Sequence, residues 1–174
     1  SHPDPALDAL LDQVIDLIAS AQQPDGYLNT HYTVVEPDKR FTNLRDCHEL
    51  YCAGHLIEAG VAHFAATGKK TLLEVVCRYA DLLGQVFGRG AGQLPGYGGH
   101  EELELALVKL YRATGNRHYL ELCRYLIDER GQQPHYYDLE AMKRGETVLA
   151  ERGRRDYSYC QAHRPVREQE AVTG

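Results

Sequence analysis

An internal repeat with an offset of 47 residues constrains the fold of this chain more than any other feature. The triplet Ala-Thr-Gly at 66–68 returns at 113–115, and Cys-Arg-Tyr at 77–79 returns at 123–125 with a slip to 46. In each copy the Ala-Thr-Gly triplet stands between two segments with helical apolar spacing. Stacked antiparallel helix pairs of this kind build α/α-solenoids and α/α-toroids. The repeat therefore predicts an all-α fold made of antiparallel helix pairs.

Apolar periodicity predicts where the helices lie. Five helices are expected, over 5–21, 47–67, 70–87, 100–114 and 117–130. Asp4 is a good N-cap because proline follows it, and Gly68, Gly115 and Gly131 close three of the helices. Residues 27–33 favour a short extended piece. We expect a loop at 132–138, within a poorly defined segment that reaches 156.

The chain length suits one domain, so 1–174 is expected to be a single unit. A closed toroid needs about twelve helices, which is more than five clear ones. We therefore expect a fragment of a longer α/α-barrel rather than an open stack. The long connections at 22–43, 88–99 and 132–138 leave the stack at one end, and the Ala-Thr-Gly turns lie at the other. Function is expected on the long-loop side.

Charge and composition exclude several classes of partner. A net charge of −6 argues against nucleic acid and anionic membranes as partners. No run approaches the roughly 18 apolar residues of a membrane helix, and no signal peptide is visible, so a cytoplasmic location is expected. Five cysteines without a C-x-x-C pair indicate a reducing compartment. The twelve tyrosines suit both a sugar site and ordinary packing, and the oligomeric state stays open.

The start of the second predicted helix carries the first candidate site. His48, Cys52 and His55 fall on one helical face at i, i+4 and i+7, a spacing that is able to hold zinc. The alternative is that Cys52 packs and His55 hydrogen-bonds in the core, and we favour it, so no metal site is expected in this chain. His48 lies at the long-loop end, where we expect it to line a binding site.

The glycine-rich loop at 95–99 leads into the second candidate, His100. Glycines let a backbone approach a ligand closely, and Tyr97 lies among them. Glu101 and Glu102 are also explained as acids that complement a helix N-terminus. That alternative does not explain His100, whereas a neutral histidine fits both the helix end and the hydroxyls of a sugar.

Other polar residues complete the candidate set. Asp25 is able to bind hydroxyls, although Asp-Gly is also ordinary turn chemistry. Glu49 and Glu101 are the only carboxylates directly beside the two histidines, and nothing fixes their separation. Residues 157–169 suit a site and a charged surface equally, and the spacing of Cys160 and His163 is not diagnostic of a thiol–imidazole pair. The candidate substrate-binding residues are His48, His100, Glu49, Glu101, Tyr97 and Asp25.

Four segments together resemble glycoside hydrolase family 127, the β-L-arabinofuranosidase family. They are Q-Q-P-D-G-Y-L-N-T (22–30), H-E-L-Y-C-A-G-H-L-I-E-A (48–59), P-G-Y-G-G-H-E-E-L-E-L-A-L-V-K-L-Y-R-A-T-G (95–115) and Q-A-H-R-P-V-R-E-Q (161–169). The resemblance spans about residues 5–174 and implies an (α/α)6 toroid followed by β-domains. It also implies retaining hydrolysis of β-L-arabinofuranosides, with a cysteine nucleophile beside a zinc ion held by cysteines and a glutamate.

The resemblance assigns roles to only two positions of this chain. His48 and His100 match family histidines that contact the arabinofuranose. The family's acid/base glutamate, zinc ligands and nucleophilic cysteine lie beyond Gly174, so no catalytic residue and no metal ligand is expected here, and zinc is expected only in the full-length enzyme. One departure is at 171–174, where the family usually has no residue between valine and glycine. By itself the chain is expected to be inactive.

Two other interpretations remain open. The chain is alternatively a helical solenoid that binds a sugar or peptide without catalysis. The second interpretation is an enzyme of a related toroid family that has a different exo-acting specificity, for another L-furanoside or an unusual acidic sugar. The expected partner is an oligosaccharide or glycoside in every enzymatic interpretation.

Overall fold

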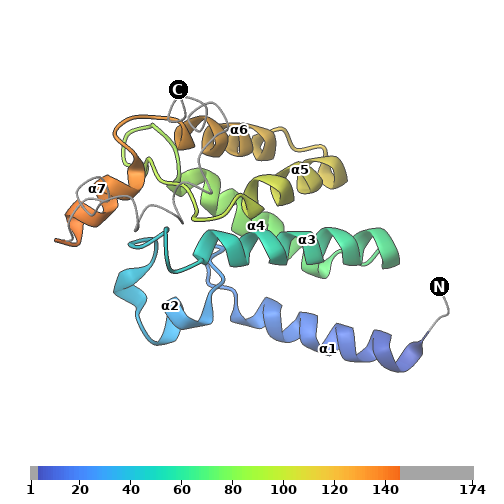
Figure 1. Ribbon diagram of the computed structural model, residues 1–174. Helices are drawn as coiled ribbons and strands as arrows, with labels where there is room; N and C mark the ends of the chain where they lie inside the picture. Colours follow the sequence, from blue (N-terminus) through green and yellow to red (C-terminus); the bar gives the residue numbers. More distant parts are fainter. Residues whose placement is uncertain (1–3, 146–174) are drawn as a thin grey trace, which may run out of the picture.

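The computed structural model describes residues 4–145, and this part of the chain folds into helices without a named strand (Figure 1). The elements in order are α1 (Pro5–Ala21), α2 (Thr30–Val34), the 3-10 turn η1 (Pro37–Lys39), α3 (Glu49–Thr67), α4 (Thr71–Val86), α5 (Glu102–Thr114), α6 (His118–Arg130) and α7 (Tyr136–Lys143). The predicted all-α class is confirmed. No helix among these residues is long and apolar enough to cross a membrane.

The helices pack in two layers. α3 packs against α4 and α5, and α5 packs in turn against α6. α4 contacts α1 and α6 on the other side, so α3 and α5 form one layer while α1, α4 and α6 form the second. Figure 1 shows the long connections together at one end of the helices and the short turns at the other. The predicted separation of the two ends is therefore confirmed.

The two Ala-Thr-Gly turns have the same geometry. Gly68 and Gly115 take left-handed φ angles of 74° and 76°, and each amide donates to a carbonyl four residues earlier. The threonines before them, Thr67 and Thr114, each donate a side-chain hydrogen bond to the carbonyl four residues back. A left-handed C-cap of this kind closes a helix and needs a glycine to avoid strain. The repeat in the sequence is thus a repeat in the structure.

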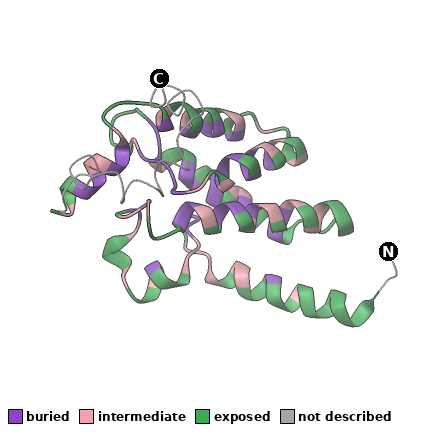
Figure 2. Ribbon diagram, in the orientation of Figure 1, coloured by how far each residue is buried: buried purple, intermediate pink, exposed green. Residues whose placement is uncertain are grey.

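The core lies between the layers, and α1 joins it only partly. Among the residues of α1, only Ile15 is buried. Five large apolar side chains of this helix are exposed, namely Leu7, Leu10, Leu11, Val14 and Leu17. Figure 2 shows the contrast with α3–α6, whose buried residues face one another. The apolar periodicity predicted the helix correctly, but most of its apolar stripe is not covered by the described residues.

Two local predictions were wrong. Residues 27–33 were expected to be extended, but 27–29 end a loop and 30–33 belong to helix α2. The Asn29 side chain caps this helix, because it accepts a hydrogen bond from the Tyr32 amide. The loop expected at 132–138 ends early, because α7 begins at Tyr136. This short helix buries Tyr136 and Tyr137, so tertiary packing rather than local periodicity stabilises it.

The helices that carry the candidate histidines also begin later than expected. α3 begins at Glu49 rather than at 47, and α5 begins at Glu102 rather than at 100. Both histidines therefore precede their helices, at the ends of the long connections. The proposed segment at 157–169, including Cys160 and His163, lies outside the described residues.

Candidate functional site

His48 sits on an unusual backbone at the start of α3. Its φ angle is 56° and its ψ angle 18°, in the left-handed region that residues other than glycine adopt rarely. Its carbonyl accepts the hydrogen bond from the Cys52 amide that opens the helix. Such backbone strain persists only where the surroundings enforce it. The chain thus turns sharply between His48, which is exposed, and Glu49, which is buried.

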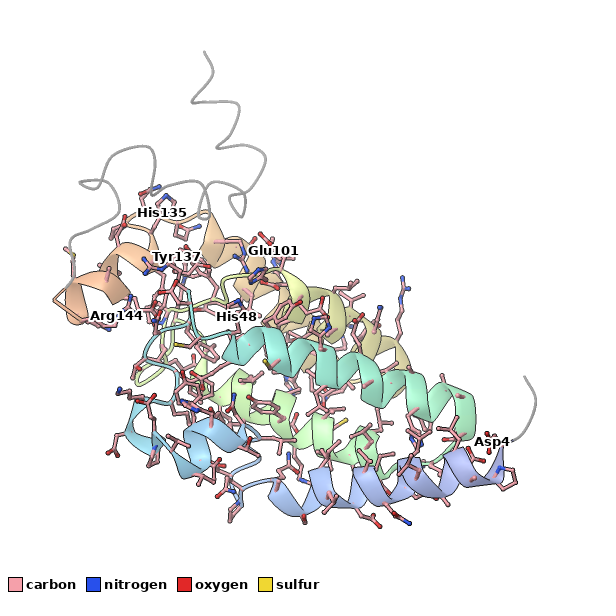
Figure 3. All side chains as sticks on the ribbon, turned by 60° about the horizontal axis from the view of Figure 1, so that its bottom comes forward. Asp4, His48, Glu101, His135, Tyr137 and Arg144 are labelled. Carbon is pink, nitrogen blue, oxygen red and sulfur yellow. The ribbon has the colours of Figure 1, made fainter. Side chains whose placement is uncertain are left out.

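His48 and His100 come together at the long-loop end of the helices. Their ring centroids lie 5.1 Å apart at an angle of 35°. The Tyr51 ring lies 4.9 Å from His100 and 5.7 Å from His48, and the His55 ring continues the row at 4.4 Å from Tyr51. We call these four residues the histidine face. Figure 3 shows His48 and Glu101 near one another at this end.

Tyr51 is a member of the histidine face that the sequence interpretation did not single out. It is half-buried and contacts both candidate histidines. The spacing in the sequence could have identified Tyr51, because residues three positions apart lie on the same side of a helix. An aromatic ring with a polar tip between two imidazoles suits contact with a sugar, which presents both hydroxyls and apolar faces.

Glu49 points into the core rather than onto the histidine face. It is 1% exposed, and its carboxylate accepts hydrogen bonds from the Tyr27 hydroxyl and, at 2.8 Å, from the Phe41 amide. Burial raises the pKa of Glu49 above its ordinary value, although the two hydrogen bonds oppose the rise. Burial and the neighbouring Glu49 also raise the pKa of the Tyr27 phenol. Glu49 therefore ties the α2 region and the loop before α3 to the helix.

Glu101 and Tyr97 both lie next to Arg130, the last residue of α6. The Glu101 side chain is 48% exposed, and its carboxylate lies 3.7 Å from the Arg130 Nε. Tyr97 is buried, with the Arg130 guanidinium 4.9 Å from its ring centroid and the Tyr137 ring 4.8 Å away. Glu101 thus remains accessible beside His100, whereas Tyr97 is part of the wall behind it.

The glycines beside Tyr97 approach protein rather than open space. A Cβ on Gly96 would lie 2.7 Å from the Leu44 side chain and 2.9 Å from the Tyr136 ring. A Cβ on Gly98 would lie 3.1 Å from the Cβ of Leu50. The close approach that these glycines permit is therefore between the loop and the core, which is a different role from the expected approach to a ligand.

Asp25 takes part in the turn after α1. Its carboxylate accepts a hydrogen bond from the Tyr27 amide and pairs with Arg40 at 2.7 Å. Burial alone would raise the pKa of Asp25, but the Tyr27 amide and the Arg40 guanidinium outweigh it and hold that pKa below its ordinary value. Arg40 also covers the Tyr27 ring at 3.6 Å. These contacts match the turn interpretation of Asp25.

One group within residues 4–145 has the composition of a metal site, and it differs from the set weighed in the sequence. His55, Glu58 and Glu102 place ligand atoms within 4.8 Å of one another. Burial and the neighbouring Glu58 raise the pKa of Glu102. The ammonium group of Lys109 pairs with Glu58, so this group of side chains already contains a positive charge. The row His48, Cys52 and His55 does not form such a group.

The histidine face offers contacts to a ligand but no complete set of glycosidase groups. A neutral imidazole has one donor and one acceptor, and a tyrosine hydroxyl has both. These groups match the hydroxyls of a sugar. Glycosidic bond cleavage needs two groups across the bond. The described carboxylates at this face include Glu101, which lies near His48 in Figure 3, and the next residue, Glu102, which pairs with His55 at 3.1 Å.

Comparisons with known proteins agree with this geometry. The family model described as the GH127 catalytic domain of β-L-arabinofuranosidase matches residues 1–174. The non-reducing end β-L-arabinofuranosidase of Bifidobacterium longum subsp. longum is 47% identical over 179 residues, which cover 99% of this chain and 27% of that protein. The chain thus spans about a quarter of the length of the curated relative that it matches.

Solved structures give the same result. The crystal structure of Ara127N-Se, a GH127 β-L-arabinofuranosidase from Geobacillus stearothermophilus T6, has a TM-score of 0.86 and 62% identity, and the match covers 95% of this chain and 26% of that one. A GH127 β-arabinofuranosidase, BT3674, has a TM-score of 0.71 and 39% identity over 75% of this chain and 22% of that one. The helix pairs are therefore part of an α/α-toroid, and the chain belongs to glycoside hydrolase family 127.

Proposed function

We propose that the whole protein hydrolyses β-L-arabinofuranosides from the non-reducing end and that the histidine face forms part of its sugar pocket. The observation that carries this proposal is the convergence of His48 and His100, whose ring centroids lie 5.1 Å apart although they stand before different helices. The relative at 47% identity is a non-reducing end β-L-arabinofuranosidase, which supports the substrate class. Family membership favours the enzyme over the non-catalytic scaffold.

The candidate residues divide into two groups in this proposal. His48, His100 and the accessible Glu101 contact the sugar, together with Tyr51. The contacts of Glu49 and Tyr97 support a role in holding the loops that carry the histidines, and those of Asp25 support a turn. Residues 4–145 bind and orient the sugar. The acid/base glutamate, the nucleophilic cysteine and the zinc ligands belong, by the family pattern, to later residues.

The test is hydrolysis of p-nitrophenyl β-L-arabinofuranoside by the full-length protein, with zinc and a thiol reductant present. We expect release of p-nitrophenol with retention at the anomeric carbon, which NMR of the early product distinguishes from inversion. The α-L-arabinofuranoside serves as the matched control and should be a poor substrate. A well-folded full-length protein that hydrolyses only a different L-furanoside, or none, contradicts the proposed substrate.

A further inference from the structure

The loop that carries His100 is held by hydrogen bonds at three consecutive residues. They run from the Tyr137 hydroxyl to the Gly98 carbonyl (2.5 Å), from the Gly99 amide to the Leu44 carbonyl (3.2 Å) and from Arg130 Nη2 to the His100 carbonyl (3.4 Å). The donors or acceptors come from three different parts of the chain. The backbone of His100 is therefore fixed by tertiary contacts rather than by its own helix.

Arg130 is the centre of these contacts. Its side chain is 5% exposed, and Nη2 also donates to Glu104 at 3.0 Å. Nη1 lies 3.4 Å from the Tyr137 hydroxyl. Because a hydroxyl can accept one hydrogen bond while donating another, Tyr137 links Arg130 to Gly98. One guanidinium thus holds the His100 carbonyl directly and the Gly98 carbonyl through Tyr137.

The charge of Arg130 is compensated within the same cluster. Burial alone would lower the pKa of Arg130, but Tyr137, Glu104 and Glu101 outweigh it and keep the guanidinium positive. Removing the buried, hydrogen-bonded partner of a buried charge is costly, and for Arg130 that partner is Glu104. Figure 3 shows Tyr137 and Glu101 at the same end of the helices as His48.

The same cluster links the two histidines. The hydrogen bond between the Gly99 amide and the Leu44 carbonyl joins the loop of His100 to the connection that leads to His48. If residues 98–100 shift relative to Leu44, the separation of the two imidazoles changes as well. We propose that Tyr137 and Arg130 are positioning residues that set the His100 ring against His48 for sugar binding. This inference rests on the proposed function of the histidine face.

The variant Tyr137→Phe tests the inference in the full-length protein. It keeps the ring packed on Tyr97 and removes only the hydroxyl that bridges Arg130 and Gly98. For p-nitrophenyl β-L-arabinofuranoside we expect KM to rise about tenfold while kcat changes by less than about threefold, because a ground-state contact is misplaced. A crystal structure of the variant should show the two histidine centroids moved from their 5.1 Å separation.

Tyr125→Phe is the matched control. This half-buried tyrosine of α6 also donates to the same loop, at 3.2 Å to Leu94 and 3.3 Å to Gly96, but farther along the chain from His100. We expect a similar loss in Tm for both variants, with KM and the centroid separation unchanged in Tyr125→Phe. A purely structural role for Tyr137 would make the two variants alike.

The outcomes separate this inference from the proposed function. An unchanged KM and an unchanged centroid separation in Tyr137→Phe overturn the inference, and so does an equal rise of KM in both variants. If the full-length wild type has no arabinofuranosidase activity, the proposed function fails. The centroid separation then still decides whether Tyr137 positions His100.

Discussion

The two helix pairs α3–α4 and α5–α6 are alike at one end and different at the other. At the turn end, the glycine and threonine caps repeat with the same hydrogen bonds. At the loop end, each pair presents a histidine, but the supports differ. A buried acid, Glu49, holds the loop of the first pair, and a buried base, Arg130, holds the loop of the second.

This difference separates what the fold requires from what the site requires. A helical hairpin closes with a local cap that any copy of the repeat can use. A binding site needs side chains at defined places, and rigid supports hold them there. The two loop ends therefore have different hydrogen-bond networks, and both place a histidine on the histidine face.

The largest expected effect is at the histidine face itself. His48→Ala and His100→Ala in the full-length protein should each lower kcat/KM by roughly a hundredfold, because each removes a sugar contact. The matched control is His118→Ala at the turn end, where the side chain is 83% exposed and activity should not change. Steady-state kinetics and thermal unfolding are measured on all three variants.

A different result for the histidines would break the comparison between the two ends. If His48→Ala and His100→Ala lowered Tm strongly and kept the KM of the wild type, the two imidazoles would be core residues. The loop end would then have no more functional role than the turn end.

The next effect concerns the buried acid of the first pair. Glu49→Ala leaves the Tyr27 hydroxyl and the Phe41 amide without their acceptor, so we expect a loss of about 2–4 kcal/mol in the free energy of unfolding. Glu101 stands in the same place beside His100 as Glu49 does beside His48, but it is half exposed. Glu101→Ala should therefore cost less than about 1 kcal/mol. Equal losses, measured by denaturant unfolding, would contradict the contrast.

The pH dependence of stability tests the burial of Glu49 separately. Because burial raises the pKa of Glu49 in the folded state, its stabilising contribution is fully present below the unfolded pKa and decreases as pH rises through the folded pKa. A separation of one pH unit between these pKa values corresponds to about 1.4 kcal/mol. Glu49→Gln keeps an acceptor and a donor but cannot ionise, so its unfolding free energy should fall less than that of the wild type as the pH rises above about 4, the ordinary carboxyl pKa. Parallel curves for the two proteins would show that the pKa of Glu49 is the same in the folded and unfolded states.

The sequence predicted the turn end in detail and the loop end in part. The Ala-Thr-Gly triplets are local signals, so the caps at Gly68 and Gly115 could be placed from residues within one helical turn. The two histidines could be placed at one end because helix direction alternates along the chain. The distance of 5.1 Å between their ring centroids depends on three-dimensional packing, so local sequence patterns could not predict it.

The supports behind the histidines could not be predicted for a physical reason. Glu49 follows His48 directly, and the left-handed backbone of His48 sends the two side chains in different directions. The sequence interpretation assigned both to the site because they are neighbours in the chain. Arg130 looked like an ordinary residue of a helix end, since its partners His100 and Glu104 lie 30 and 26 residues away.

The smallest expected effect is the one that should be equal in both pairs. Gly68 and Gly115 have nearly the same positive φ, and a Cβ built on either meets nothing within 4 Å. Alanine at these positions therefore carries only the conformational cost of a left-handed residue, about 1 kcal/mol. Gly68→Ala and Gly115→Ala should each lower the unfolding free energy by this amount, and the double variant by about the sum, since distant sites are additive. Asparagine, which tolerates the left-handed region, should cost less at both positions. A clear inequality between the two alanine variants would mean that one turn depends on tertiary contacts, and the turn ends would no longer be equivalent.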